Sequence, residues 1–281
     1  MRVITQPGPI APERQEILPV EGQAIKVTLR PDIPLEDAVA EALATAGCDG
    51  AWLEFSDAPV AALDYVIPAL SPDDEHVAWY SAIHTFGGPG RIERLGMMVG
   101  REGTASFLHG HGLWIPEGGE IAMGHILAPR TMLSEPTVAH GTGITGSHFA
   151  RQADPETNFT LFRPAGAAKE GQDSRHALVR LAPNQDFAHA LEQVCTRLGW
   201  DGARVHGLGS LIGAWFDDGT ILDSIATEFL ILDAEVRTEG SAGKGPEITI
   251  VGIDGSDIRS GRLCRDQNPV LITAELMLER C

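Results

Sequence analysis

The chain of 281 residues is acidic, with 39 Asp and Glu against 21 Lys and Arg and a formal net charge of −18 at pH 7. Such a surface repels phosphate backbones and anionic lipid, so nucleic acid is an unlikely partner unless a local basic patch forms. No apolar run approaches the roughly 20 residues that a membrane-spanning helix needs. The 4 cysteines show no Cys-x-x-Cys spacing, which indicates free thiols in a reducing compartment. We therefore expect a cytoplasmic protein without a membrane segment.

The length suffices for two domains of about 100 to 150 residues each. Residues 1–23 are rich in Pro, Glu and Gln and indicate an extended leader. The alternating segment 24–30 predicts a strand. A helix is expected over 34–46, because Pro and acidic residues occupy its first turn and Gly47 suits a left-handed C-terminal cap. Residues 50–55 predict the next strand.

The rest of the first half predicts a meander of strands. Segment 64–75 holds two prolines and an Asp-Asp pair, which is typical of an exposed connection. Strands are expected, in order, at 76–86, 92–99, 107–114, 121–127 and 137–140. Residues 151–157 are polar. Residues 165–174 contain Gly, Ala, Lys and Glu but no large apolar side chain, and they predict an interdomain linker.

The same order of elements returns after this linker, which indicates an internal repeat. Trp200-Asp201-Gly202-Ala203 repeats Cys48-Asp49-Gly50-Ala51. The other repeated elements are a strand at 177–181, a helix at 186–198, and strands at 228–236 and 247–252. The chain therefore contains two copies of one strand–helix–strand–meander unit.

Three histidines in the first copy carry the strongest chemical signal. If 107–114 is a strand, its two-residue period puts His109 and His111 on one face, and the following turn brings His125 beside them. Three neutral imidazoles suit zinc or another borderline divalent ion, with a fourth position open to water or substrate. The simpler alternative is that His109 and His111 alternate out of a half-exposed strand and that His125 is unrelated.

The second copy differs at the corresponding positions. The three histidines are replaced there by Ile248, Ile250 and Arg262. These residue types do not suit such an ion, so the second copy should bind no metal. We hypothesise instead that a glycine-rich turn at 205–211 faces the metal of the first copy, because glycine lets the backbone approach a ligand. The ligand-binding candidates in this turn are Gly207, Gly209 and Ser210. Otherwise the turn is only a tight bend and the second copy only scaffold.

These features together resemble the plants and prokaryotes conserved (PPC) domain. The resemblance rests on His109-Gly110-His111, Gly124-His125-Ile126-Leu127, Gly207-Leu208-Gly209-Ser210-Leu211 and the segment 149–157, although neither copy carries the full set. It implies a PPC-domain-like α/β (α+β) fold: two tandem copies, at 24–164 and 175–281, of a mainly antiparallel sheet packed against a helix. It also implies homotrimers and, as in bacterial and archaeal members, zinc at the three histidines.

One class of function is a zinc-dependent hydrolase or lyase that acts on a small metabolite, with a carboxylate-bearing compound as one option. Such an enzyme needs an acid or base near the ion and a group that holds the substrate. The catalytic candidates are Glu117, Glu120, His84 and Arg30, with Glu54 and His140 as further acid–base residues and Arg180 as a second carboxylate-binding residue. Each also has a simpler interpretation as a solvated turn acid, a strand histidine or a surface charge.

Two other classes stay open. The metal can be structural, or the site can bind a small ligand for regulation without turnover. A structural zinc is normally closed by a fourth protein ligand. None stands out in the local sequence, and His140 or a residue from another subunit are the options. A DNA-associated regulatory role is the last class. Plant PPC proteins carry an Arg-Gly-Arg-Pro type AT-hook, and no such segment occurs in this sequence.

Overall fold

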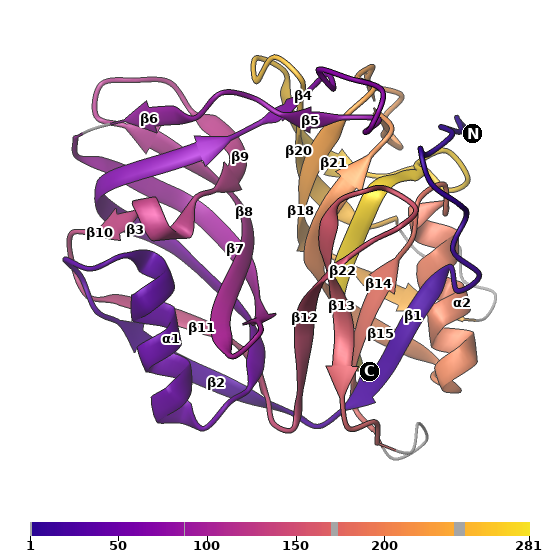
Figure 1. Cartoon of the computed structure of the whole chain (residues 1–281), viewed down its shortest axis with the longest axis horizontal. Coiled ribbons are helices and arrows are strands. Elements are labelled where there is room, and N and C mark those ends of the chain that lie inside the picture. The colour runs from indigo at the N-terminus through magenta and orange to yellow at the C-terminus, as the bar shows by residue number, and fades with distance from the viewer. Residues whose placement is uncertain (1, 87, 170–173, 239–244) are drawn as a thin grey trace.

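The computed structural model describes residues 2–86, 88–169, 174–238 and 245–281. Within these ranges, two large sheets lie side by side and each carries one α-helix on its outer side (Figure 1). The expected unit of a mainly antiparallel sheet against a helix is therefore present twice. The α/β description fits only broadly. Outside the two α-helices, almost all residues in regular secondary structure lie in strands, so the fold is mainly β. Neither described α-helix is long and apolar enough to cross a membrane.

The first sheet contains the predicted histidine hairpin. Its strands are β2 (Gly22–Leu29), β3 (Gly50–Val66), β6 (His84–Phe86), β7 (Gly90–Glu102), β8 (Ala105–Pro116), β9 (Ala122–Ile126), β10 (Met132–Leu133), β11 (Thr137–Ile144), β12 (Ser147–Ala153) and β13 (Thr160–Gly166). Because β3 is long, it pairs with β7 along its first part and with β9 at its end. Strands β3, β7, β8 and β9 therefore close into a ring. Helix α1 (Leu35–Ala46) covers the outer face and ends at Gly47, whose φ of 68° is left-handed as expected.

The second sheet repeats this order of strands. It runs β14 (His176–Leu181), β22 (Val270–Arg280), β15 (Gly202–Leu211), β18 (Thr227–Asp233), β20 (Glu247–Gly252) and β21 (Ile258–Arg262), with β19 (Glu235–Arg237) also paired to β15. In the first sheet the corresponding neighbours are β2, β11, β3, β7, β8 and β9. Helix α2 (Phe187–Leu198) covers the outer face, and Asp186 caps its N-terminus by accepting a hydrogen bond from the backbone N–H of His189. The internal repeat thus extends to strand order.

The inner faces of the two sheets pack against each other. This layer contains Trp52, Met98, Met123 and Phe149 from the first half and Leu208, Leu230, Val251 and Met277 from the second. Each sheet is thus covered on both faces, by its helix outside and by the other sheet inside. Covered strands are apolar on both sides, so a polar side chain in this layer needs a specific partner.

The expected leader, residues 1–23, includes a strand. Residues Gln15–Val20 form β1, which pairs antiparallel with β14 at the edge of the second sheet, although the next strand, β2, belongs to the first. Pro19 lowers the strand propensity of this segment, but an edge strand tolerates proline because one side of it needs no hydrogen bond. The N-terminal segment therefore ties the two sheets together.

Three other predicted segments have different bounds. The strand expected at 76–86 is reduced to β5 (Trp79–Tyr80), which pairs with β4 (Pro68–Ala69), and to β6. Residues 64–66, expected in a connection, continue β3, because their backbone finds partners in β6 and β9. Strand β13 ends only at Gly166, inside the expected linker, and residues 170–173 of that linker lie outside the described ranges.

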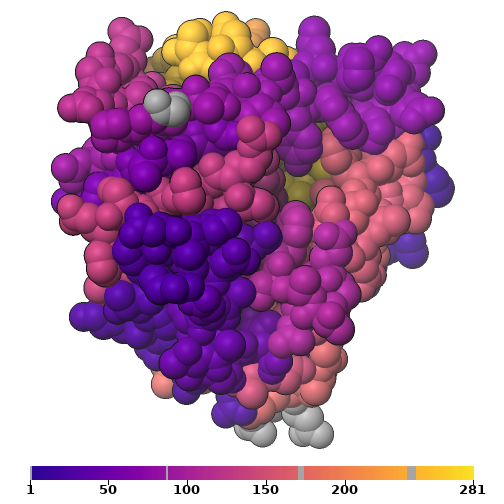
Figure 2. Space-filling view, turned by 60° about the vertical axis from the view of Figure 1, so that its left-hand side comes forward, coloured from indigo at the N-terminus to yellow at the C-terminus, as the bar shows by residue number. Residues whose placement is uncertain are grey.

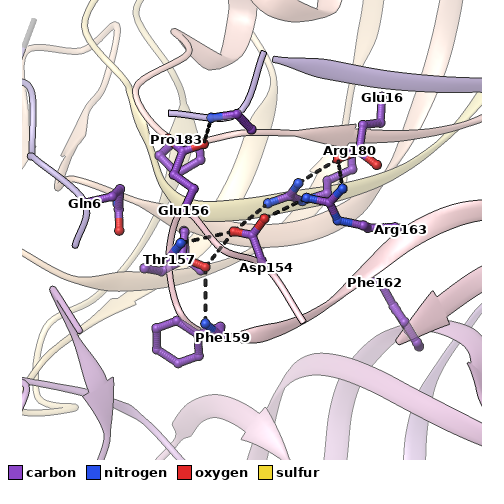
Figure 3. Close-up of polar contacts among 12 residues, drawn as sticks. Gln6, Glu16, Asp154, Glu156, Thr157, Phe159, Phe162, Arg163, Arg180 and Pro183 are labelled. Atoms are coloured by element: carbon purple, nitrogen blue, oxygen red, sulfur yellow. Dashed lines mark hydrogen bonds and ion pairs between the residues drawn. The ribbon is translucent and has the colours of Figure 1, made fainter. Parts of the chain in front are cut away.

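An ionic network joins the loop after β12 to the second half (Figure 3). The carboxyl of Asp154 contacts Arg163 at 2.7 Å and Arg180 at 3.2 Å. Burial alone would raise the pKa of Asp154, but Arg180, the Thr157 hydroxyl and Arg163 together hold it below its usual value. Glu156 forms a second, bidentate contact with Arg14. Since breaking a buried pair leaves an uncompensated charge, this network fixes the β12–β13 hairpin.

Candidate metal centre

The three predicted histidines converge in the layer between the sheets. Strands β8 and β9 pair antiparallel, with His111 directly opposite His125. The alternation of β8 sends Leu108 toward α1, whereas His109 and His111 face the second sheet. Each ring offers one ligand atom, and these atoms lie within 4.8 Å of one another. The local sequence folds in this way because the glycine-rich turn after Pro116 closes a tight hairpin.

The partners of two rings fix which nitrogen points into the centre. His111 Nδ1 lies 2.8 Å from the carbonyl oxygen of Phe229, which only accepts, so Nδ1 carries the proton. His109 Nδ1 lies 2.5 Å from Oε2 of Glu275 and donates in the same way. In the neutral rings both Nε2 atoms therefore present lone pairs, and they lie 3.2 Å apart. Two ligand nitrogens on one tetrahedral zinc ion are separated by roughly 3.3 Å. A divalent ion bound by both nitrogens would relieve the repulsion between their lone pairs.

The electrostatics favour the neutral form of His111 and His125, and neutral imidazole is the state that binds metal. Burial, together with the neighbouring His109, lowers the pKa of His111 to about 3. Burial also lowers the pKa of His125 well below its usual value. Nδ1 of His125 is buried and has no hydrogen-bond partner among the described residues. A proton held between His109 and His111 is the alternative to a metal, but it leaves this third nitrogen unsatisfied.

Both residues that orient the histidine rings come from the second half of the chain. Phe229 lies on β18 and Glu275 on β22, whereas the rings lie on β8 and β9. Second-sphere partners of this kind fix ring orientation and raise ligand basicity. Neither residue is a sequence-predicted candidate. The available signal is the acid at Glu275 within the run 270–278, whose other residues are apolar except Thr273, since a buried carboxyl in such a strand needs a partner.

A first pocket, the apolar pocket, adjoins the histidines and has an empty volume of about 510 Å³. It is lined by His109, His111, Trp79, Tyr80, Phe159, Leu161, Gly209, Ser210, Glu228 and several small or aliphatic side chains. Burial raises the pKa of Glu228 to about 8, although the backbone N–H of His125 partly offsets this. Its Oε2 is buried and has no hydrogen-bond partner within the described ranges. The pocket therefore places a carboxyl group beside two of the imidazoles.

A second pocket, the arginine pocket, also has His109 in its wall and has an empty volume of about 830 Å³. It is lined by His109, His125, Tyr80, Phe107, Arg151, Leu161, Phe162, Glu275 and their neighbours. Figure 2 shows a hollow on one face of the molecule, with yellow atoms of the C-terminal segment at its floor. His109, Tyr80 and Leu161 line both pockets, so the two adjoin at the histidines.

The predicted catalytic residues do not lie near this centre. Glu117 and Glu120 are exposed in the hairpin turn and line neither pocket, because β8 carries the turn several residues beyond His111. His84 is exposed on β6, where it stacks on Tyr65. Arg30 is exposed and pairs with Glu41 of α1. These candidates therefore find no support in the geometry.

Glu54, His140 and Arg180 lie elsewhere too. Glu54 and His140 are cross-strand partners on β3 and β11, and neither lines the two pockets. Arg180 has a side chain only 1% exposed that is held between Glu16 and Asp154, so it is not available to bind a substrate carboxylate.

The glycine-rich segment 205–211 is a strand and not a turn. It forms part of β15, whose register with β22 shifts between Gly209 and Leu211. Gly209 and Ser210 line the apolar pocket with His109 and His111, whereas Gly207 does not. A Cβ atom on Gly209 would lie 2.4 Å from the carbonyl oxygen of Thr273, so close packing on β22 requires the glycine. Binding of a ligand by this segment stays a prediction.

The alignment of the histidines with Ile248 and Ile250 is wrong by one residue. Both isoleucines belong to the core beneath α2, whereas Val251 belongs to the layer between the sheets and Thr249 contacts Met123 there. Because side chains alternate along a strand, a shift of one residue exchanges the two faces. Thr249 and Val251 therefore share the inner face on which the first half has its histidines.

No protein-family model and no curated protein matches the chain. Similar solved structures include a metal-containing protein from Archaeoglobus fulgidus, with 19% identity and a TM-score of 0.39 over 52% of this chain and 95% of that one. A PPC protein from Pyrococcus horikoshii has 12% identity and a TM-score of 0.38 over 52% and 94%. A Bacteroides thetaiotaomicron protein proposed to bind DNA has 12% identity and a TM-score of 0.39, and the match covers 51% of this chain and 96% of that one.

These neighbours include a PPC protein, and each covers about half of this chain. With identities of 12% to 19% and TM-scores of 0.38 to 0.39, this likeness carries no argument about the function of this chain. Two of the similar structures are named as proteins proposed to bind DNA, which runs against the expectation that nucleic acid is an unlikely partner. These names describe those two proteins and not this chain, so the expectation stays a prediction.

Proposed function

We propose that this PPC-like chain binds one zinc or similar divalent ion at His109, His111 and His125 and acts as a hydrolase or lyase on a small molecule. The observation that carries the metal is the pair of Nε2 atoms 3.2 Å apart, on two rings whose Nδ1 atoms contact partners in the second half. An ion held by three imidazoles lowers the pKa of water and polarises a carbonyl oxygen.

The protein supplies the other parts of such a site. Glu275 and the Phe229 carbonyl hold two rings in place, so little reorganisation is needed when substrate binds. The apolar pocket favours contact with apolar parts of a substrate, because aromatic and aliphatic side chains form most of its wall. This arrangement supports binding of a small compound beside the histidines.

Glu228 is the proposed acid–base residue, in place of the exposed candidates. Its carboxyl lines the same pocket as His109 and His111, and its Oε2 has no partner among the described residues. A carboxyl oxygen in that position can hold or accept a proton at the reacting group of a bound substrate. Glutamine preserves the shape of this side chain but cannot transfer the proton.

The test combines elemental analysis with a substrate screen. We expect about one equivalent of zinc or a related ion per chain and turnover of an ester, amide or carbon–oxygen lyase substrate that a chelator abolishes. Glu228→Gln should keep the metal and lose at least roughly a hundredfold in kcat, the lower range for general acid–base catalysis. As a matched control, Glu247→Gln at the first residue of β20 should change neither the metal content nor kcat. Metal without turnover across the screen would support the non-catalytic ligand-binding alternative instead, and protein that binds no metal would refute the proposal.

A further inference from the structure

The two pockets beside His109 differ in their charged side chains. The apolar pocket contains three aromatic side chains, Trp79, Tyr80 and Phe159, and its one acidic side chain is the buried Glu228. A carboxylate placed there would meet a second carboxyl in an apolar environment, which is unfavourable. Flat apolar groups fit this pocket well, since aromatic rings pack edge to face or offset against one another.

The arginine pocket contains one cation that can bind an anion. Arg151 lies on β12 with its guanidinium 4.7 Å from the ring centre of Phe107. It pairs with Glu102, whose side chain is 53% exposed at the rim. An exposed pair of this kind contributes little, so a ligand anion can replace Glu102 at small cost. The other charge in the pocket, Glu275, is engaged by His109 and by the backbone N–H of Phe162.

Arg151 is also held in position by its surroundings. It lies on the β12–β13 hairpin, and the Asp154 network fastens the end of that hairpin to Arg180 of the second sheet. The stacking on Phe107 fixes the guanidinium plane from one side. A planar guanidinium held in this way can bind both oxygens of a carboxylate. This gives a role to the polar segment 151–157, which the metal centre itself does not use.

We propose that the site takes small aromatic or cyclic carboxylic acids, with the carboxylate on Arg151 and the ring in the apolar pocket. His109 lines both pockets, so a ligand that spans them has the atoms between its ring and its carboxylate at the histidines. This assignment rests on the proposed function for the reaction at that midpoint. It replaces Arg30 and Arg180, the sequence-predicted carboxylate-binding residues, with Arg151.

The test uses calorimetry to measure the binding of a panel of one-ring and two-ring carboxylic acids. Each acid is compared with its neutral primary amide, and each measurement is made on zinc-loaded and on chelated protein. We expect at least one acid to bind roughly tenfold more tightly than its amide, the effect of one charge-assisted hydrogen bond. Arg151→Gln should abolish this preference with metal content unchanged, and Arg151→Lys should restore part of it. Trp79→Ala should weaken ring acids and leave propionate binding unchanged.

A matched control is Arg101→Gln, because Arg101 pairs with Asp49 and lines neither pocket. It should leave the preference intact. Equal binding of acid and amide, binding of no acid in the panel, or an unchanged preference in Arg151→Gln would overturn the inference. These outcomes are separate from the proposed function, which fails on metal content. A protein that cannot be loaded with metal but still prefers the acids would keep the inference and refute the metal enzyme, whereas a preference that persists after chelation bears on the inference alone.

Discussion

The two halves of the chain share strand order, an outer helix and a covered inner face, yet they contribute different chemistry to the layer between them. The first half places three imidazoles there, and the second places two carboxyls and one backbone carbonyl: Glu228, Glu275 and that of Phe229. Neither set is sufficient alone. The imidazole rings need partners that orient them, and the buried carboxyls need polar or charged partners. The duplicated half is therefore part of the site and not only scaffold in this geometry: besides these three groups, its Gly209 and Ser210 form part of the wall of the apolar pocket.

The largest effect should come from the histidines themselves. Replacing both His109 and His111 by Ala should remove about one equivalent of bound divalent ion, because one remaining imidazole holds such an ion weakly. Thr249→Val is the matched control, since Thr249 lies on the inner-facing side of β20 in the second half. Elemental analysis decides the comparison. Unchanged metal content in the double variant would mean that the ion lies elsewhere.

The dependence of one half on the other is tested by Glu275→Gln. Glutamine keeps the size of the side chain but is a weaker acceptor for His109 Nδ1–H. We expect metal affinity to fall by roughly 10- to 100-fold, as for other second-sphere carboxyls, with the fold retained. Competition with a chromophoric chelator measures this. Glu279→Gln on the same strand should leave the affinity unchanged, and equal losses in both variants would argue for general damage to β22.

Substitution of a β15 glycine should lower the unfolding free energy and leave the metal content largely unchanged. Gly209→Ala would put Cβ 2.4 Å from Thr273 O and 2.7 Å from the Cα of Ala274, both backbone atoms that cannot move freely. Overpacking of this kind costs about 1–3 kcal/mol of unfolding free energy. Urea unfolding should show the loss with metal content retained. Gly88→Ala, with no atom within 4 Å of its Cβ, is the neutral control. A stable Gly209→Ala variant with weakened ligand binding would restore the pocket-wall hypothesis.

Two buried groups, one from each half, should bend the pH–stability curve of chelated protein in opposite directions. Because the pKa of His111 is lowered from 6.5 to about 3, the folded state binds fewer protons there and stability is lost as pH falls below 6.5. Because the pKa of Glu228 is raised from 4.5 to about 8, the folded state keeps an extra proton and stability is lost as pH rises from 4.5 to 8. Each slope is at most ~1.4 kcal/mol per pH unit.

Denaturant unfolding of the variants separates these two effects. Glu228→Gln should flatten the decline above pH 4.5, and His111→Phe should flatten the decline below pH 6.5. A pH–stability curve of Glu228→Gln that runs parallel to wild type would show that Glu228 ionises normally in the folded chain. The control is Asp74→Asn, at an exposed position in the connection before β5, which should leave both limbs of the curve in place.

The smallest effect is expected with DNA. From the net charge of −18 we expect duplex binding no tighter than roughly 10⁻⁴ to 10⁻⁶ M at physiological salt, the range of non-specific contacts. Fluorescence anisotropy over a range of salt concentrations measures this. Specific binding at nanomolar protein would favour the DNA-associated alternative. The expected homotrimer also stays a prediction, which sedimentation tests directly.

The sequence by itself determined the local features of this protein. The period of β8, the turn after Pro116 and the cap at Gly47 depend on neighbouring residues, so both helices and the three converging histidines could be predicted. The repeated order of elements gave the tandem organisation in the same way. The alignment of Ile248 and Ile250 failed because a one-residue error exchanges strand faces, and local sequence does not show which face meets the second sheet.

Only the tertiary structure decided what surrounds the histidines. Glu275 is 166 residues from His109 in sequence and Phe229 is 118 from His111, and no spacing rule links residues so far apart. Whether an acid is catalytic or solvated depends on burial, which distinguishes Glu228 from the exposed Glu117 and Glu120. Burial is a property of the packed sheets: the same carboxyl is an ordinary surface charge in water and a costly, chemically useful group between two apolar layers.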